Sequence, residues 1–232
     1  IYASANNGLK GTTITFPKIS VGATENAIIA AANSNGKTIW KKCAVEPEIL
    51  DLISYLNKIG SDITLKGRTI KVNGKSNFKN NSHSIIFDRI ELGTYIIASA
   101  LIGKKIDINN INTNYIMTEL KILKKMGVKL KIKKSKISIL GSGKLKSVSI
   151  ETKPYPGFPT DLQAQIMVLM TQASGVSIIK ENIFENRFMH VPELRRMGAK
   201  INIKNNKAIV NGPTKLSGAE VMATDLRASV SL

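Results

Sequence analysis

The chain has 232 residues, of which 43% are hydrophobic, and its formal net charge is +18 at pH 7. This length fits one large domain or two modest ones, at about 150 residues per domain. The longest apolar runs are shorter than the roughly 18 residues that a transmembrane helix needs, and the first residues show no secretory signal. One cysteine excludes an internal disulfide and, with only two histidines, argues against a Cys/His metal site. We therefore expect a globular, cytoplasmic protein without a metal site.

The excess of lysine raises the question of nucleic-acid binding. Many lysines alternate with isoleucine and leucine, as in "KLKIKKSKISIL" (129–140), which would place them on the solvated face of an amphipathic strand. Aromatic residues make up only 5% of the chain and do not alternate with the basic ones, as a base-stacking surface requires. Small anionic substrates are therefore the favoured partners. A basic nucleic-acid-binding module remains an alternative, and it would show a steep salt dependence of DNA binding.

A degenerate repeat of about 70 residues organises the chain. Each copy reads as an apolar helix, a Gly-x-x-Ile strand, a second amphipathic helix ended by glycine, two short alternating strands and a turn glycine. Such a copy is too long for a solenoid repeat and long enough for a small α/β subdomain. The Gly-x-x-Ile strands of the three copies are "GKTI" (36–39), "GKKI" (103–106) and "GVSI" (175–178). The glycines that end the second helices are Gly60, Gly127 and Gly198, and the turn glycines are Gly74, Gly141 and Gly212.

Both ends of the chain interrupt this repeat. "GLKG" (8–11) resembles "KLSG" (215–218), so the chain opens on the tail of one copy, and it stops at "TDLRASVSL" with another copy barely begun. We interpret the chain as part of a longer protein.

The segment "FPKISVGATENA" (16–27) is a candidate anion site. An extended stretch ends at Ser20 and Gly22, before a helix that we expect to begin near Thr24. Backbone N–H groups at a helix start, with Lys18 beside them, suit a phosphate or diphosphate. An ordinary capped helix explains the pattern equally well, and the Gly-x-x-x-x-Gly-Lys spacing of a P-loop is absent.

The segment "YPGFPTDLQAQ" (155–165) leads through prolines into a second helix. Pro159 disfavours helical geometry just before it, and Thr160 or Asp161 could cap the helix start. A cap is the simplest interpretation of Asp161. The prolines exceed what a cap requires, however, and would hold a carboxylate that the helix dipole keeps ionised, available as a general base.

Two arginines are candidate anion ligands. Arg187 lies in a polar cluster within "ENIFENRFMH" (181–190), where it could bind a carboxylate or phosphate through two hydrogen bonds, or could brace a loop in a buried ion pair. Arg227, in "MATDLRASVSL" (222–232), could contact an anion if it faces the same cleft.

Other polar residues are interpreted as structural. The segment "FDRIELGT" (87–94) places Thr94 before an apolar helix, with charged residues bracing its approach. His190 is interpreted as a structural histidine and Cys43 as a structural thiol.

Six motifs, taken together and in order, resemble those of the UDP-N-acetylglucosamine 1-carboxyvinyltransferases, a branch of the enolpyruvyl transferase family. The resemblance covers the whole chain. The sister group, 3-phosphoshikimate 1-carboxyvinyltransferase, shares the fold but has other motifs, and it is kept as an alternative. The motifs are "SVGATENA", "EPEI.DL", "DRIE.GT", "PYPGFPTD.QAQ", "FENRFMHVPEL.RMGA" and "GA.VMATDLRAS.SL".

The resemblance implies an inside-out α/β barrel of two lobes, each built from three repeated subdomains. Residues 1–86 would form the C-terminal part of the first lobe, and residues 87–232 most of the second, truncated at its last subdomain. The implied reaction transfers the enolpyruvyl group of phosphoenolpyruvate to the 3-hydroxyl of UDP-N-acetylglucosamine and releases phosphate, the first committed step of peptidoglycan synthesis. It implies no cofactor, no nucleic-acid or membrane partner, and a monomer at full length.

The resemblance also implies roles for particular residues. Asp161 would meet the sugar 3-hydroxyl as the base, and Ile183 would line the nucleotide-sugar pocket. Arg187 and Arg227 would face the phosphate or carboxylate of phosphoenolpyruvate, where cations stabilise the charge of an intermediate. The uridine diphosphate would be held by Lys18, Ile19, Ser20, Val21 and Gly22.

Some functional parts of the family match nothing in these 232 residues. They are its N-terminal Lys-Asn pair, its early arginines, the mobile loop that carries a Cys or Asp acid, and its C-terminal arginine. We therefore expect little or no turnover from the 232-residue chain alone.

Overall fold

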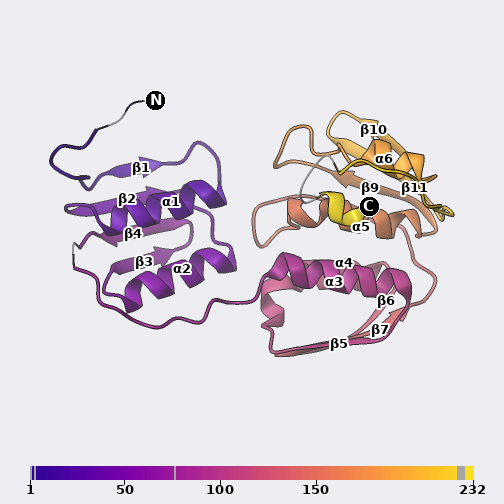
Figure 1. Cartoon of the computed structure of the whole chain (residues 1–232), viewed down its shortest axis with the longest axis horizontal. Helices are drawn as coiled ribbons and strands as arrows, with labels where there is room; N and C mark the ends of the chain where they lie inside the picture. Colours follow the sequence, from indigo (N-terminus) through magenta and orange to yellow (C-terminus); the bar gives the residue numbers. More distant parts are fainter. Residues whose placement is uncertain (1, 3, 76, 224–227) are drawn as a thin grey trace. The chain divides into compact units, whose positions relative to one another are not determined.

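The computed structural model describes residues 2, 4–75, 77–223 and 228–232, and the chain forms two compact units, Ile1–Ile86 and Phe87–Leu232 (Figure 1). Each unit has its own hydrophobic core. In the part of the chain so described, no helix has both the length and the apolar character to cross a membrane.

The first unit is a four-stranded sheet with two helices packed on it. The sheet has the order β1-β2-β4-β3, in which β1 is parallel to β2 and the other pairs are antiparallel. Both helices contact the sheet and each other, and their apolar faces form the core with β4. The elements are β1 (Thr13–Thr15), α1 (Val21–Ala32), β2 (Lys37–Lys41), α2 (Pro47–Lys58), β3 (Asp62–Lys66) and β4 (Thr69–Asn73).

The second unit contains two further copies of this pattern. The first copy has an antiparallel sheet of order β5-β7-β6, and the second has a sheet of order β8-β9-β11-β10 in which β8 is parallel to β9. The first comprises α3 (Arg89–Ile102), β5 (Ile106–Asn109), the 3-10 turn η1 (Thr113–Ile116), α4 (Met117–Lys125), β6 (Val128–Lys133) and β7 (Lys136–Ser142). The second comprises β8 (Ser149–Glu151), η2 (Thr160–Leu162), α5 (Gln163–Thr171), β9 (Gly175–Lys180), α6 (Val191–Arg196), β10 (Lys200–Lys204) and β11 (Lys207–Gly212), followed by η3 (Ala228–Ser231).

The repeat predicted from the sequence is confirmed element by element. The glycines after the second helices, Gly60, Gly127 and Gly198, have φ values of 116°, 98° and 101°, in the region that glycine alone enters freely. Gly212 ends the last strand of its copy against the end of α5, where a Cβ atom would lie 2.3 Å from the carbonyl oxygen of Ala173. The structure adds a short leading strand, β1 or β8, to two of the copies.

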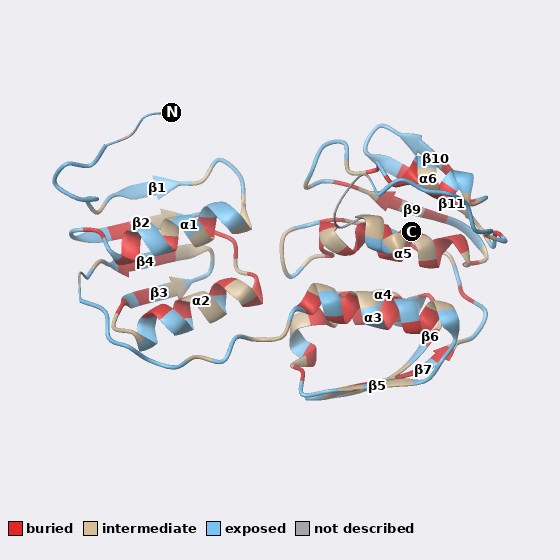
Figure 2. Ribbon diagram, viewed as in Figure 1, coloured by how far each residue is buried: buried red, intermediate tan, exposed pale blue. Residues whose placement is uncertain are grey.

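The second unit places its helices inside and its sheets outside. Helix α3 packs against α5 on one side and against β7 on the other, while α5 also contacts β9 and β11. Figure 2 shows buried residues along these helices and on parts of the strands, such as β9. Helix α5 is buried on nearly every side, as expected for a helix with sheet on one flank and helix on the other. The expected inside-out α/β arrangement is therefore present.

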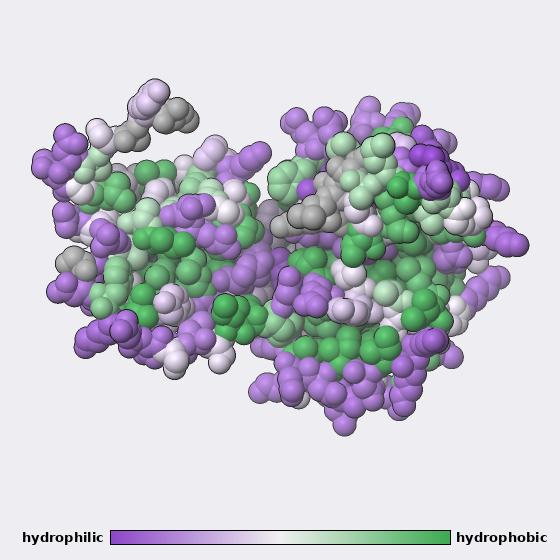
Figure 3. All heavy atoms as spheres, in the orientation of Figure 1, coloured by the Kyte–Doolittle hydropathy of each residue, from purple (hydrophilic) through white to green (hydrophobic). Residues whose placement is uncertain are grey.

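The lysines of the β6–β7 hairpin are solvated, as the sequence pattern predicts. Lys129, Lys131 and Lys133 of β6 are exposed, while Ile137 and Ile139 of β7 are fully buried. Figure 3 shows hydrophilic residues gathered along the outer side of this sheet. These lysines therefore reflect an amphipathic sheet.

Two expected helix starts were wrong by a few residues. Helix α1 begins at Val21 and not near Thr24, because Ser20 is already its N-cap. Helix α3 begins at Arg89, because the Asp88 carboxylate accepts hydrogen bonds from the first free N–H groups. Thr94 consequently lies inside this helix and not before it.

Candidate functional site

The proline-rich loop that leads into η2 is tied down at several points. The N–H of Lys153 donates to the carbonyl oxygen of Phe158 (3.0 Å), which closes the loop. A Cβ at Gly157 would lie 2.4 Å from the Cβ of Lys153, so the closure requires glycine. The Thr118 hydroxyl on α4 donates to the carbonyl oxygen of Pro156 (2.6 Å). The loop is therefore held in place, and this fixes the position at which η2 begins.

Asp161 and Arg187 form an ion pair at the end of this loop. The Asp161 Oδ1 atom lies 3.0 Å from Arg187 Nη2, and the two side chains keep 22% and 18% of their surface exposed. The Arg187 guanidinium also stacks over the Phe184 ring, 5.2 Å from its centroid. The N-caps of η2 and α5 are Pro159 and Leu162, and not the predicted Thr160 or Asp161; neither N-cap makes a side-chain cap bond. A carboxylate and a cation are thus held together at a partly open surface.

A buried glutamate, Glu181, lies behind this pair. Its side chain accepts hydrogen bonds from the hydroxyls of Thr152 (2.8 Å) and Thr160 (2.9 Å). It also accepts from the backbone N–H groups of Ile183 (2.8 Å) and Phe184 (3.2 Å). Sequence reasoning missed Glu181. A glutamate at a strand end followed by a loop is a weak local signal, and its two threonine partners come from distant segments.

Two further residues were predicted for this site, Ile183 and Arg227. Ile183 is half-buried in the loop after β9, on the segment that carries Arg187. Arg227 lies outside the described residues. The structure therefore brings Asp161, Ile183 and Arg187 into one neighbourhood.

The predicted anion site forms the start of α1 in the first unit. The Ser20 side chain accepts from the N–H of Ala23 (3.3 Å), and Thr24 anchors the turn by accepting from the N–H of Ala44 (3.0 Å). Helix geometry leaves the first N–H groups, including those of Val21 and Gly22, without intrahelical partners. A Cβ at Gly22 would meet no atom within 4 Å among the described residues, so this backbone is open to a ligand.

Two lysines lie beside this turn. The first turn of α1 contains no acidic residue, and Lys18 is exposed beside it. Lys42 adds a second cation, since its Nζ donates to the carbonyl oxygen of Pro17. The positive end of the helix dipole adds to their effect.

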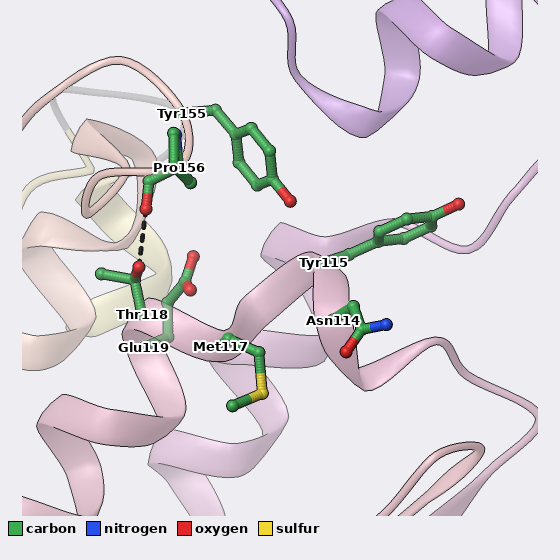
Figure 4. Close-up of a pocket in the computed structure, with 7 residues that line it drawn as sticks. All are labelled: Asn114, Tyr115, Met117, Thr118, Glu119, Tyr155 and Pro156. Atoms are coloured by element: carbon green, nitrogen blue, oxygen red, sulfur yellow. Dashed lines mark hydrogen bonds between the residues drawn. The ribbon is translucent and has the colours of Figure 1, made fainter.

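A small hollow lies beside the proline-rich loop (Figure 4). At its edge the buried Glu119 carboxylate lies 3.9 Å from Arg89 Nη1, and the Arg89 guanidinium is 5.6 Å from the centre of the Tyr155 ring. Burial raises the pKa of Glu119 to about 7, against the opposing effects of a backbone hydrogen bond and of Arg89. The hollow is lined by Asn114, Tyr115, Met117, Thr118, Glu119, Tyr155 and Pro156.

Metal ligation has no visible basis in this part of the molecule. Among the residues that the structure describes, no three His, Cys, Asp or Glu side chains are grouped so that they could hold a metal ion.

Comparisons with known proteins agree on the family. The family model described as EPSP synthase (3-phosphoshikimate 1-carboxyvinyltransferase) matches residues 1–232. Curated UDP-N-acetylglucosamine 1-carboxyvinyltransferases from Pelagibacter ubique and Rickettsia prowazekii are 55% and 52% identical to the chain over its whole length. The chain spans 56% of the length of each of these relatives.

Solved structures show the same architecture. The enolpyruvyl transferase NikO from Streptomyces tendae matches with a TM-score of 0.83 at 26% identity, over 90% of this chain and 51% of NikO. EPSP synthase from Acinetobacter baumannii matches in fold, with a TM-score of 0.70 at 18% identity, over 97% of this chain and 55% of that enzyme. The match over all 232 residues and the shared helix-inside architecture place this chain in the enolpyruvyl transferase family that the EPSP synthase model describes.

Proposed function

We propose that this protein transfers the enolpyruvyl group of phosphoenolpyruvate to the 3-hydroxyl of UDP-N-acetylglucosamine, with release of phosphate. The observation that carries the proposal is the Asp161–Arg187 pair, a carboxylate and a cation 3.0 Å apart at a partly open surface. The relatives at 50–55% identity, which are named for this reaction, support the choice of acceptor.

The pair supplies two groups that the reaction needs. Asp161 accepts the proton of the sugar 3-hydroxyl as the hydroxyl oxygen bonds to the central carbon of phosphoenolpyruvate. The methylene carbon takes a proton from the loop acid, which matches nothing in these 232 residues, and becomes a methyl group. The tetrahedral intermediate then loses a methyl proton and phosphate, which restores the double bond. Arg187 exchanges the Asp161 carboxylate for an anionic group of phosphoenolpyruvate, and this frees Asp161 to meet the hydroxyl. Arg227 is assigned to the same substrate.

The start of α1 binds the diphosphate in this proposal. Exposed N–H groups at a helix start, Lys18 beside them and an open approach over Gly22 favour a doubly charged ligand. Ile19, Ser20 and Val21 complete the turn against the nucleotide. We also assign Ile183, in the second unit, to binding of the nucleotide sugar.

The wider assignments are also part of the proposal. Residues 1–86 belong to the first lobe of the enzyme and residues 87–232 to the second. The reaction would supply peptidoglycan synthesis in the cytoplasm, by a monomer that needs no nucleic-acid or membrane partner. Two small anionic substrates are consistent with the basic net charge.

A chimera tests the proposal. The 232 residues replace the matching segment of the Pelagibacter ubique relative, to which they are 55% identical. Phosphate release from phosphoenolpyruvate is then measured with UDP-N-acetylglucosamine or with shikimate 3-phosphate as acceptor. We expect release with the nucleotide sugar alone. Release with shikimate 3-phosphate instead would favour the alternative that the name of the family model offers, and release with neither would contradict both.

A further inference from the structure

We propose that Glu181 is a positioning residue that sets Asp161 and Arg187 in the relative placement that the transfer reaction uses. The inference rests on the proposed function, because it concerns how the same site is built. Only 3% of the Glu181 surface is exposed, so the residue acts through its neighbours and not on a substrate.

The Glu181 carboxylate joins two separate segments of the chain. One oxygen, Oε1, accepts from the Thr152 hydroxyl and from the N–H groups of Ile183 and Phe184. The other, Oε2, accepts from the hydroxyl of Thr160. Thr160 of the proline-rich loop is therefore bonded to one oxygen, and the loop after β9 shares the other oxygen with Thr152.

Each fastening point is next to a member of the ion pair. Thr160 directly precedes Asp161 in η2, so its hydroxyl bond fixes the turn from which the Asp161 carboxylate projects. Phe184, whose N–H is held by Glu181, has its ring under the Arg187 guanidinium. Glu181 thus controls the base and the cation at once.

The glutamate itself is fixed to the sheet. Its N–H donates to the carbonyl oxygen of Asn206 (2.8 Å), and Asn206 Nδ2 donates to the carbonyl oxygen of Glu181 (2.9 Å). Asn206 lies in the turn between β10 and β11. Through Glu181, both loops are therefore bonded to the sheet. Their positions do not depend on solvent-exposed contacts with each other.

The chemistry of the contact is specific to a carboxylate. Burying a carboxylate is unfavourable unless its oxygens are well bonded, and an apolar side chain could fill the same space without that penalty. A carboxylate at this place can, however, accept from hydroxyls and N–H groups on both of its sides. The reaction needs the two loops placed relative to each other to within a fraction of an ångström. The hydrogen bonds of Glu181 are directional and can fix this placement, which packing alone does not do.

Variants in the active chimera test this role. Thr160→Val removes one hydroxyl bond to Glu181 and keeps the shape of the side chain, while Thr160→Ser keeps the hydroxyl. Thr214→Val is the matched control, because Thr214 is equally buried (8% against 9% exposed) and donates to the carbonyl oxygen of Asn211, away from the pair. Glu181→Leu removes all of the carboxylate bonds at once.

The expected result separates kcat from KM. Thr160→Val lowers kcat about tenfold because Asp161 is displaced, and it leaves KM for the nucleotide sugar within about threefold, because the diphosphate is held at α1. Thr160→Ser restores kcat, and Thr214→Val stays within about twofold of the unmodified chimera. The double variant of Glu181→Leu and Thr160→Val loses no more activity than Glu181→Leu alone, because the two residues act through one bond.

Other results overturn the inference. If the unmodified chimera is active but Thr160→Val behaves like Thr214→Val, or if Thr160→Ser fails to restore kcat, Glu181 has no positioning role while the proposed function stands. If Glu181→Leu does not fold, the three threonine variants still decide the question. An unmodified chimera that is inactive with UDP-N-acetylglucosamine removes the proposed function, and this inference with it.

Discussion

Asp161 and Arg187 are 26 residues apart in the sequence and 3.0 Å apart in the structure. Both side chains are half-buried. In the proposed reaction they supply a base and a cation to one substrate, at a place where Glu181 bonds to both surrounding loops.

Replacing Asp161 by asparagine in the chimera should lower kcat by about 100-fold or more, because the base that accepts the hydroxyl proton is lost. Binding of UDP-N-acetylglucosamine, measured by calorimetry, should change little. Asp107→Asn is the control, since Asp107 is an exposed carboxylate on β5 that pairs with Lys136. Equal rates for the Asp161 and Asp107 variants would show that Asp161 is not the base.

Replacing Lys18 by alanine should weaken binding of UDP-N-acetylglucosamine by about tenfold, the effect of one charge-assisted contact of about 1.5 kcal/mol. Lys129→Ala, on the solvated face of β6, removes the same charge elsewhere and should have no such effect. Calorimetric titration of both variants checks the prediction. An equal loss in both would mean that only net charge attracts the ligand.

Sequence patterns identified Asp161 and Arg187 separately, from prolines before one and a polar cluster around the other. They left open whether each was structural, because the contact between them depends on tertiary packing. Glu181 was missed for the same reason, since its partners Thr152 and Thr160 come from other segments. The roles predicted for Ile183 and for the start of α1 remain proposals.

At the scale of elements, the periodicity of the sequence predicted the helices and paired strands of each copy. It missed the leading strands β1 and β8, whose three residues are too few for an alternating pattern. It also missed the 3-10 turn η2, because an apolar run after a proline does not distinguish a 3-10 turn from an α-helical one. Short elements are therefore where sequence reasoning failed.

Gly212→Ala should lower the free energy of unfolding by about 2–3 kcal/mol. The added Cβ would lie 2.3 Å from the carbonyl oxygen of Ala173 and under 3 Å from those of Thr171 and Met170, all at the end of α5. Gly143→Ala is the matched control, since a Cβ there meets no described atom within 4 Å. Urea unfolding gives the free energy of unfolding of both variants. Equal values would show that β11 and the end of α5 can move apart at little energetic cost.

Glu119 on α4 should make stability depend on pH. Its pKa is about 7 in the folded protein and 4.5 as a free group, so the folded state binds a proton that the unfolded chain releases. This contribution, about 3 kcal/mol, is complete below pH 4.5 and is lost as the pH rises through 7. Glu119→Gln should remove that part of the pH dependence in urea unfolding between pH 4 and 8. If the stability of the Glu119→Gln variant and that of the unmodified protein changed with pH in the same way, Glu119 would not have the raised pKa of a buried carboxyl.

At the scale of the molecule, the repeat indicated subdomains of one pattern, and the resemblance supplied how they assemble. The inside-out arrangement has a visible cause in the second unit, where buried and mostly apolar residues lie on nearly all sides of α5, so that this helix needs other elements packed around it. Spacing in the sequence cannot show which copies pack together, because their apolar faces are alike. The family match and the shared architecture with NikO provide that part.

The most direct test of the account is the chemical identity of the product. The chimera is incubated with phosphoenolpyruvate and UDP-N-acetylglucosamine, and the nucleotide sugar is analysed by mass spectrometry and NMR. We predict an enolpyruvyl ether on the 3-oxygen of the sugar, formed in equal amount to the released phosphate. An unmodified nucleotide sugar, or an enolpyruvyl group at another oxygen, would contradict the account.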